Sequence, residues 1–191
     1  MADHEICTIL DPPHLIKCLR NLFMKHNIKC KTDVQSSGQQ VYGTAKWSHI
    51  ETFYELDKNN PNFVYAPALT DIHIKYAAQI FSHSVAAGIL AKVASNELPA
   101  ECVATANLLN KMDMLFDSLN ADSKDLRRGK KLSTNMSNNS QHLNYFKEIK
   151  IFIDSLSFVG SRTNPPSQDG WIRTINAIEK LWHYLKEIKT L

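Results

Sequence analysis

Apolar residues recur every three to four positions through most of this chain, and this helical spacing limits its fold more than any other feature. The regular alternation of strands and helices that an α/β domain requires is absent. We therefore predict an all-α class, with one short strand at Ile6–Leu10. The spacing predicts helices over about residues 12–26, 48–58, 71–96, 100–120 and 140–156, and a final helix from about Trp171.

Length and composition are those of an ordinary globular domain. The 191 residues suit one domain and are enough to bury a core. A net charge of +3 permits nucleic-acid binding without requiring it. The four cysteines form no Cys-x-x-Cys pair, and their spacing to the histidines matches no common zinc finger, so we expect reduced thiols.

No segment of the sequence reads as a targeting signal or a membrane span. The start MADHEIC lacks the basic and apolar regions of a signal peptide. The apolar-leaning stretch 77–93 is interrupted by polar residues such as Gln79 and Lys92. We expect an intracellular protein, in the nucleus or the cytoplasm. The basic run 127–131 is a weak nuclear-localisation pattern or a solvated part of a charged loop.

Asp11 ends the apolar segment Ile6–Leu10 and precedes Pro12-Pro13 and a basic amphipathic helix. An acid at the carboxyl end of a strand is a usual place for a metal-binding carboxylate. From the pattern alone, a helix cap or a turn is the more frequent role for a single aspartate. Both roles stay open at this point.

The predicted long helix carries a polar stripe. Lys75, Gln79 and Ser82 stand at positions i, i+4 and i+7, so a continuous helix would place them on one face. Such a stripe is most often a solvated surface. Its functional alternative is a nucleotide site, with charge from lysine and hydrogen bonds from glutamine and serine.

The stretch Asn110-Lys111-Met112-Asp113 matches the guanine-reading motif of GTPases, but the chain has no Gly-x-x-x-x-Gly-Lys-Ser/Thr loop, so we reject the match. The end of the same helix is more informative, because Asp113, Asp117 and Asn120 align at i, i+4 and i+7. A carboxylate can accept two hydrogen bonds from the N–H edge of guanine, and Phe116 can stack on a base. The alternative is an ordinary last helical turn with Asn120 as its cap.

Taken in order, several segments resemble the P-element-type transposases, including the THAP-domain transposase-like proteins of animals. The matching segments are DPPHLIKCLRN (11–21), LTDIH (69–73), YAAQIFSHSVAAGI (76–89), LFDSLN (115–120) and WIRTINAIEKLWHYL (171–185). The resemblance implies an RNase H-like catalytic domain with a magnesium-binding DDE triad, split by a large helical insertion that binds GTP. In that family the GTP is not hydrolysed for energy and helps to hold transposon-end DNA.

On this resemblance, residues 1–12 are a remnant of the RNase H-like domain and residues 13–191 are the helical GTP-binding insertion domain. Asp11 falls on the second acid of the triad, and would bind metal only if the rest of the triad were supplied. Asp57 is our candidate for the acid that reads guanine. The other positions at or beside the family's GTP contacts are Ile74, Lys75, Ser82, Phe116, Asp117 and Asn120.

The sequence also departs from the family. Ala68 stands where a lysine usually precedes Leu-Thr, and the lysine-rich stretch before the long helix is missing. Both changes remove positive charge from the phosphate side of the expected site. Two-metal chemistry needs several carboxylates around the ions, so we expect no transposase or nuclease activity from a chain with Asp11 alone. The alternative function is a domesticated or relic helical interaction module without nucleotide binding.

Overall fold

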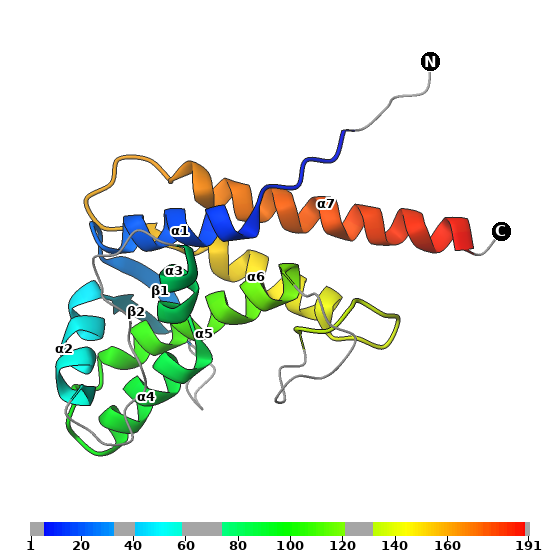
Figure 1. Cartoon of the computed structure of the whole chain (residues 1–191). Coiled ribbons are helices and arrows are strands. Elements are labelled where there is room, and N and C mark those ends of the chain that lie inside the picture. The colour runs from blue at the N-terminus through cyan, green and yellow to red at the C-terminus, as the bar shows by residue number, and fades with distance from the viewer. Residues whose placement is uncertain (1–5, 33–40, 59–73, 121–131, 190–191) are drawn as a thin grey trace.

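The computed structural model describes residues 6–32, 41–58, 74–120 and 132–189, and it is mostly helical with one small sheet (Figure 1). This confirms the predicted helical class. The elements are α1 (Pro12–Phe23), β1 (Ile28–Thr32), β2 (Val41–Ala45), α2 (Trp47–Asp57), α3 (Ile74–Ile80), α4 (His83–Ala94), α5 (Cys102–Leu119), α6 (His142–Asp154), β3 (Ser157–Phe158) and α7 (Pro166–Lys189).

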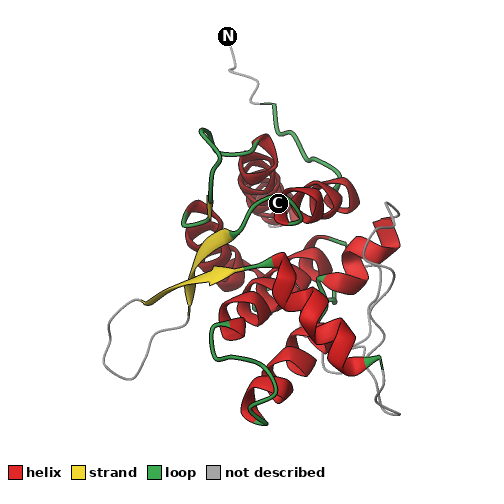
Figure 2. Cartoon of the chain, turned by 90° about the vertical axis from the view of Figure 1, so that its left-hand side faces the viewer, coloured by secondary structure: helices red, strands yellow, loops and turns green. Residues whose placement is uncertain are grey.

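The three strands form an antiparallel sheet in the order β2-β1-β3, at the side of the helices (Figure 2). The predicted strand at Ile6–Leu10 is wrong, because among the described residues this segment is not in a strand and pairs with none. The Leu10 N–H instead donates to Thr174 Oγ1 of α7 at 3.0 Å. The sequence did not predict the hairpin of β1 and β2. Each strand is only five residues long and gives a weak alternation signal.

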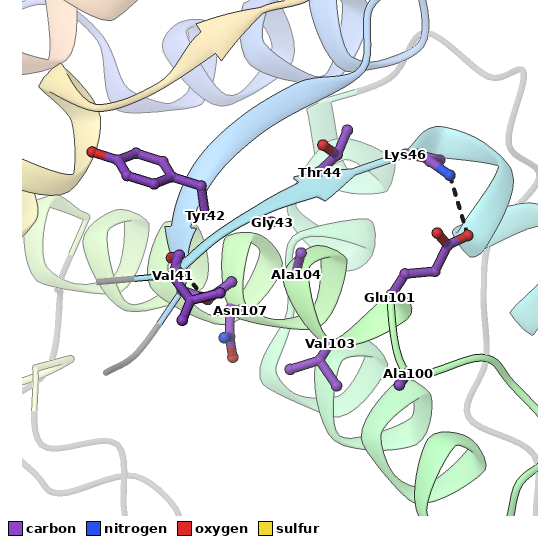
Figure 3. Close-up of a pocket in the computed structure, with 11 residues that line it drawn as sticks. Val41, Tyr42, Gly43, Thr44, Lys46, Ala100, Glu101, Val103, Ala104 and Asn107 are labelled. Atoms are coloured by element: carbon purple, nitrogen blue, oxygen red, sulfur yellow. Dashed lines mark hydrogen bonds and ion pairs between the residues drawn. The ribbon is translucent and has the colours of Figure 1, made fainter. Parts of the chain in front are cut away.

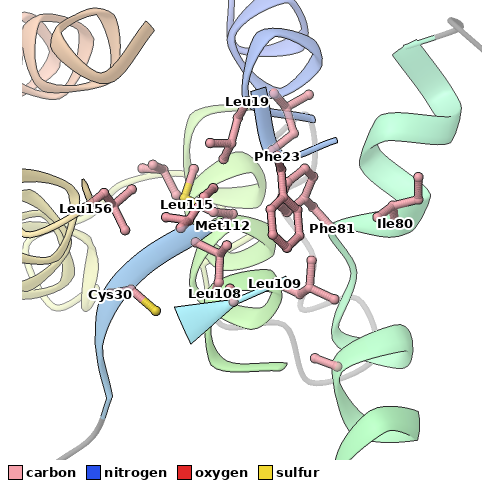
Figure 4. Packing of buried hydrophobic residues seen from close by; sticks show 14 of the residues in the cluster. Leu19, Phe23, Cys30, Ile80, Phe81, Leu108, Leu109, Met112, Leu115 and Leu156 are labelled. Carbon is pink, nitrogen blue, oxygen red and sulfur yellow. The ribbon is translucent and has the colours of Figure 1, made fainter. Parts of the chain in front are cut away.

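Helix α5 is the centre of the core, and its buried side chains meet those of α1, α3 and the sheet (Figure 4). Leu108, Leu109, Met112 and Leu115 are fully buried. Removing each such side chain from water is worth roughly 1.5–3 kcal/mol. The sheet approaches α5 closely at Gly43, where an added Cβ would lie 2.5 Å from Ala104 Cβ.

The predicted helix 71–96 is wrong as a single element, because it is interrupted at Phe81–Ser82 between α3 and α4. Ser82 has extended backbone angles (φ −133°, ψ 149°), and its side chain accepts a hydrogen bond from Val85 N at 3.3 Å. A serine offers the backbone this capping alternative to a continuous helix. The polar stripe inferred from Lys75, Gln79 and Ser82 therefore does not lie on one helix.

Residues 77–94, by length and composition, are apolar enough to cross a membrane. This is weak evidence for a span, because the core helices of soluble proteins meet the same criterion. The stretch is interrupted by the break, and 33% of it is buried in the structure. Ile80, Val85 and Ile89 are among its core residues.

Two helix starts differ from the predictions. Helix α2 begins at Trp47, and its N-cap is Lys46, without a side-chain capping bond. Helix α7 begins at Pro166, a residue suited to the first helical turn. Leu185 of α7 is 45% exposed, because this half of α7 extends beyond α1 and α6 (Figure 1).

Candidate functional site

The start of α4 is held against the second half of α5. The His83 N–H donates to Asp113 Oδ2 at 3.1 Å, and His83 Nδ1 lies 3.0 Å from Asn110 Oδ1. Asp113 is only 6% exposed. The apparent GTPase motif is therefore part of a helix, and two of its residues contact the start of α4.

The break between α3 and α4 places the capped N-terminus of a helix at this junction. Helix N-termini carry unpaired N–H groups and a partial positive charge, so they favour anions. The Asp113 carboxylate supplies one negative charge there through His83 N. Ser82, the N-cap, is half-buried.

The next turns of α5 bring further predicted residues to the same region. Phe116 and Asp117 are half-buried, and Asn120 is exposed and caps α5 through its N–H bond to the Phe116 carbonyl at 2.9 Å. Asp113 and Asp117 lie one turn apart on α5, and Asn120 follows the last helical residue as the C-cap, which is the alternative role considered for it.

A tyrosine of α6 reports the negative charge at this end of α5. Burial raises the pKa of Tyr145, and the nearby carboxylates of Asp113, Glu148 and Asp117 raise this pKa further. The Tyr145 hydroxyl donates to the Lys111 carbonyl at 2.6 Å. Two carboxylates of α5, Asp113 and Asp117, thus lie near this buried hydroxyl.

Asp57 is the last residue of α2, and among the described residues no hydrogen bond or ion pair links its side chain to this junction. Helix α2 lies beside the N-terminal end of α5 (Figure 1), where His49 Nδ1 is 2.8 Å from Thr105 Oγ1. Asp117 is twelve residues beyond Thr105, or about 18 Å along a helix. Ile74 and Lys75 are the first two residues of α3, and their side chains lie outside the described part of the structure.

Asp57 nevertheless has an unusual environment. It is 5% exposed, and within the described ranges its Oδ2 atom has no hydrogen-bond partner. A buried polar atom without a partner is costly, so it is a reasonable place to expect a bound donor.

Asp11 acts as the N-cap of α1. It is exposed, and its Oδ2 accepts a hydrogen bond from His14 N at 3.0 Å. Among the described residues, no three His, Cys, Asp or Glu side chains are grouped so that they could hold a metal ion. These residues alone do not fit a magnesium centre, and a catalytic role for Asp11 stays a prediction.

A groove that the sequence did not indicate lies between β2 and the start of α5. It has a volume of about 800 Å³, and its lining includes Tyr42, Thr44, Lys46, Glu101 and Asn107 (Figure 3). Lys46 Nζ and Glu101 Oε1 form an ion pair at 3.1 Å beside it. None of the predicted site residues lines this groove.

A buried histidine, His49, contacts both Glu101 at the groove and the buried Thr105 of α5. His49 Nδ1 contacts Thr105 Oγ1, and His49 Nε2 lies 3.3 Å from Glu101 Oε1. Thr105 Oγ1 also accepts a hydrogen bond from Lys46 N at 3.1 Å. Burial lowers the pKa of His49, with Glu101 acting in the opposite direction. The network fits a neutral imidazole that accepts from Thr105 and donates to Glu101.

The match to a family model assigns this helical body, with its small sheet and interrupted helix, to the insertion domains of transposase-like proteins. The family model for the TNP-like, GTP-binding insertion domain matches residues 13–132, and the chain belongs to this family. The sequence resemblance to P-element-type transposases is thereby confirmed. No curated protein matches the chain.

A solved structure supports the same fold. The chain resembles the Drosophila P element transposase strand transfer complex with a TM-score of 0.71 and 17% sequence identity. The match covers 96% of this chain and 41% of that chain, so the present sequence spans less than half of the transposase. At this identity, the similarity establishes the fold alone.

Proposed function

We propose that this chain binds a guanine nucleotide at the junction of α3, α4 and the second half of α5. The observation that supports this most is the hydrogen bond from His83 N, next to the N-cap Ser82, to Asp113 Oδ2 of α5 at 3.1 Å. Asp113 lies about one helical turn before the half-buried Phe116 and Asp117. The chain belongs to a family defined as GTP-binding.

In this proposal the base lies at the end of α5. The Asp117 carboxylate accepts hydrogen bonds from N1–H and the exocyclic amine of guanine, and Phe116 stacks on the ring. Asn120 lies at the edge of the base, and Ile74 supplies an apolar contact. Adenine presents no matching pair of donors, so the site prefers guanine.

The phosphates lie toward the start of α4. Its N-terminus favours anions, the Ser82 hydroxyl donates a hydrogen bond, and Lys75 supplies charge. Mg²⁺ enters this proposal only as a counter-ion of the phosphates, because the described residues contain no metal-binding cluster.

The first test is a thermal melt of the purified chain with Mg²⁺ and GTP, with ATP and GDP as controls. A ligand that binds only the folded state stabilises it by about 2.7 kcal/mol at one hundred times its dissociation constant. We expect GTP to raise the melting temperature and ATP to leave it unchanged. Equal shifts with GTP and ATP would contradict guanine recognition.

Asp57 is a second candidate for the guanine-reading acid, because its buried Oδ2 has no partner in the described ranges. The Asp57→Asn variant separates the two positions. If Asp117 reads the base, this variant keeps the GTP-dependent shift, and if Asp57 reads it, the shift disappears. Circular dichroism of the free variant checks that its fold is intact.

An interaction module without nucleotide binding is the competing function. The exposed apolar side chains Leu181, Tyr184, Leu185 and Ile188 on α7 favour it, and so does Ala68, which lies outside the described residues. A chain that melts cooperatively, shows no shift with any nucleotide and retains a protein partner in a pull-down would support this function.

We further propose that the chain has no transposase or nuclease activity on its own, and that transposon-end DNA is a partner of a longer transposase containing such a domain. Asp11 would then be the second acid of a triad whose other members come from elsewhere. A nuclease assay with Mg²⁺ and labelled duplex DNA tests this, and we expect no cleavage. Cleavage that is lost in Asp11→Asn would overturn the proposal.

A further inference from the structure

One face of the small sheet is exposed, and the strand register defines it. Lys29 pairs with Thr44 on β2 and with Ser157 on β3, and Lys31 pairs with Tyr42. Directly paired residues place their side chains on the same face of a sheet. We call this the outer face, made by Lys29, Lys31, Tyr42, Thr44 and Ser157.

The opposite face of the sheet belongs to the core. Ile28, Cys30 and Ala45 are fully buried there, and Cys30 Sγ lies 3.9 Å from the Ala104 carbonyl of α5. Burial also raises the pKa of Cys30 to about 11. The two faces therefore differ sharply, one apolar and packed, the other polar and accessible.

The outer face carries unbalanced positive charge. Lys29 is exposed, Lys31 is half-buried, and none of the five positions is acidic. Within the part of the chain that the structure describes, neither lysine has an ion-pair partner. By contrast, Lys46, Lys92 and Lys150 each pair with a glutamate.

An accessible aromatic ring lies beside this charge. Tyr42 is 60% exposed and stands on β2, the edge strand, directly across from Lys31. Figure 3 shows its ring pointing away from Ala104 and Glu101 of α5. A ring in this position is available for stacking, and the hydroxyls of Thr44 and Ser157 are available as hydrogen-bond donors.

We propose that the outer face binds single-stranded nucleic acid. Tyr42 stacks on a base, and Lys29 and Lys31 contact backbone phosphates. The hydroxyls of Thr44 and Ser157 fix the position of the backbone without reading sequence. This surface is separate from the proposed nucleotide site. An experiment can therefore disprove either proposal without disproving the other.

Fluorescence anisotropy of the full chain with a labelled thymidine oligonucleotide of about 15 nucleotides tests the proposal over a salt series. Each phosphate contact contributes about 0.7 to the slope of log affinity against log salt for single strands. The Lys29→Gln, Lys31→Gln double variant should therefore lower the magnitude of the slope by about 1.4. The matched control is Lys17→Gln with Lys147→Gln, two lysines outside the sheet, and it should leave the slope unchanged. Equal effects of the two double variants would overturn the proposal.

The tyrosine gives an independent measurement. Tyr42→Ala should raise the dissociation constant about fivefold or more, because a stacked base contributes at least about 1 kcal/mol. Tyr42→Phe keeps the ring and should keep the affinity. A duplex of the same length offers no free base and should bind more weakly than the single strand. Absence of binding at low salt, or equal affinity for the duplex, would overturn the proposal, and the GTP melt on the same variants reports the nucleotide site separately.

Discussion

The two ends of α5 are built differently. Near its start, Ala104 meets Gly43 of the sheet, and Thr105 is fully buried between Lys46 N and His49. Near its end, Phe116 and Asp117 remain half-buried and Asn120 is exposed. The first end thus acts as a scaffold, while the second keeps polar and aromatic groups within reach of a ligand. Changes at the first end should alter stability, and changes at the second should alter binding.

The largest effect we expect is at the scaffold end. Gly43→Val should lower the free energy of unfolding by about 3 kcal/mol, because the new side chain collides with Ala104 Cβ and Thr32 Cγ2. Urea denaturation measures this. Adding Ala104→Gly should restore part of the loss, and the GTP-dependent shift should survive in the folded fraction. If Gly43→Val were as stable as the wild type, the close approach of Gly43 to Ala104 would not contribute to the stability of this end of α5.

At the ligand end, Asp117→Asn should remove most of the roughly 2.7 kcal/mol of stabilisation by GTP at one hundred times its dissociation constant. The asparagine amide N–H group is a donor and cannot pair with the exocyclic amine of guanine, which is also a donor. Xanthine carries a carbonyl oxygen at this position, and this oxygen can accept the hydrogen bond. Xanthosine triphosphate should therefore stabilise the variant better than GTP does. Thermal melts with both nucleotides measure this. A variant that still prefers GTP would show that another group reads the base.

A smaller stability effect should follow from Thr105→Val, again at the scaffold end. The change keeps the shape but removes the acceptor of Lys46 N and the partner of His49 Nδ1, at a cost of about 2 kcal/mol. Thr105→Ser retains both hydrogen bonds and is the matched control. Chemical denaturation of the two variants gives the difference. If serine destabilises as much as valine, packing of the methyl group, and not hydrogen bonding, is the cause.

The smallest effect is the pH dependence of the scaffold end. Because the folded-state pKa of His49 is lowered, the unfolded state binds more protons as the pH falls through about 6.5. The contribution of His49 to stability should therefore be complete above that pH. It should decrease as the pH falls from the pKa of the unfolded state toward the lower pKa of the folded state. His142 is shifted in the same direction by burial. Thermal melts of the wild type and of His49→Gln between about pH 5.5 and 7.5 separate the contributions of the two histidines. If the variant showed the same dependence of stability on pH as the wild type, a group other than His49 would be its cause.

Amphipathic spacing explains which parts of this fold were predictable. Helices such as α5 and α6 were predicted within a few residues, because their apolar stripes face one core. The break at Ser82 was missed because the apolar spacing continues across it, and only the capping bond reveals it. The hairpin was missed because its strands are short, and the Gly43 contact depends on α5, which is distant in sequence.

The candidate site was predictable only in its local part. The alignment of Asp113 and Asp117 follows from helical geometry alone. The hydrogen bond between Asp113 and His83 links residues thirty positions apart, so no local pattern indicates it. Asp57 was grouped with these residues by the family resemblance, and no local pattern links it to them.

The first described residues run along the middle of α7. Leu10 N donates a hydrogen bond to Thr174 Oγ1, and Ile6, Cys7 and Thr8 line a small cleft with Ala177 and Lys180 of α7. A force applied to this segment would therefore act on α7 first, and only through the core on the sheet and α5.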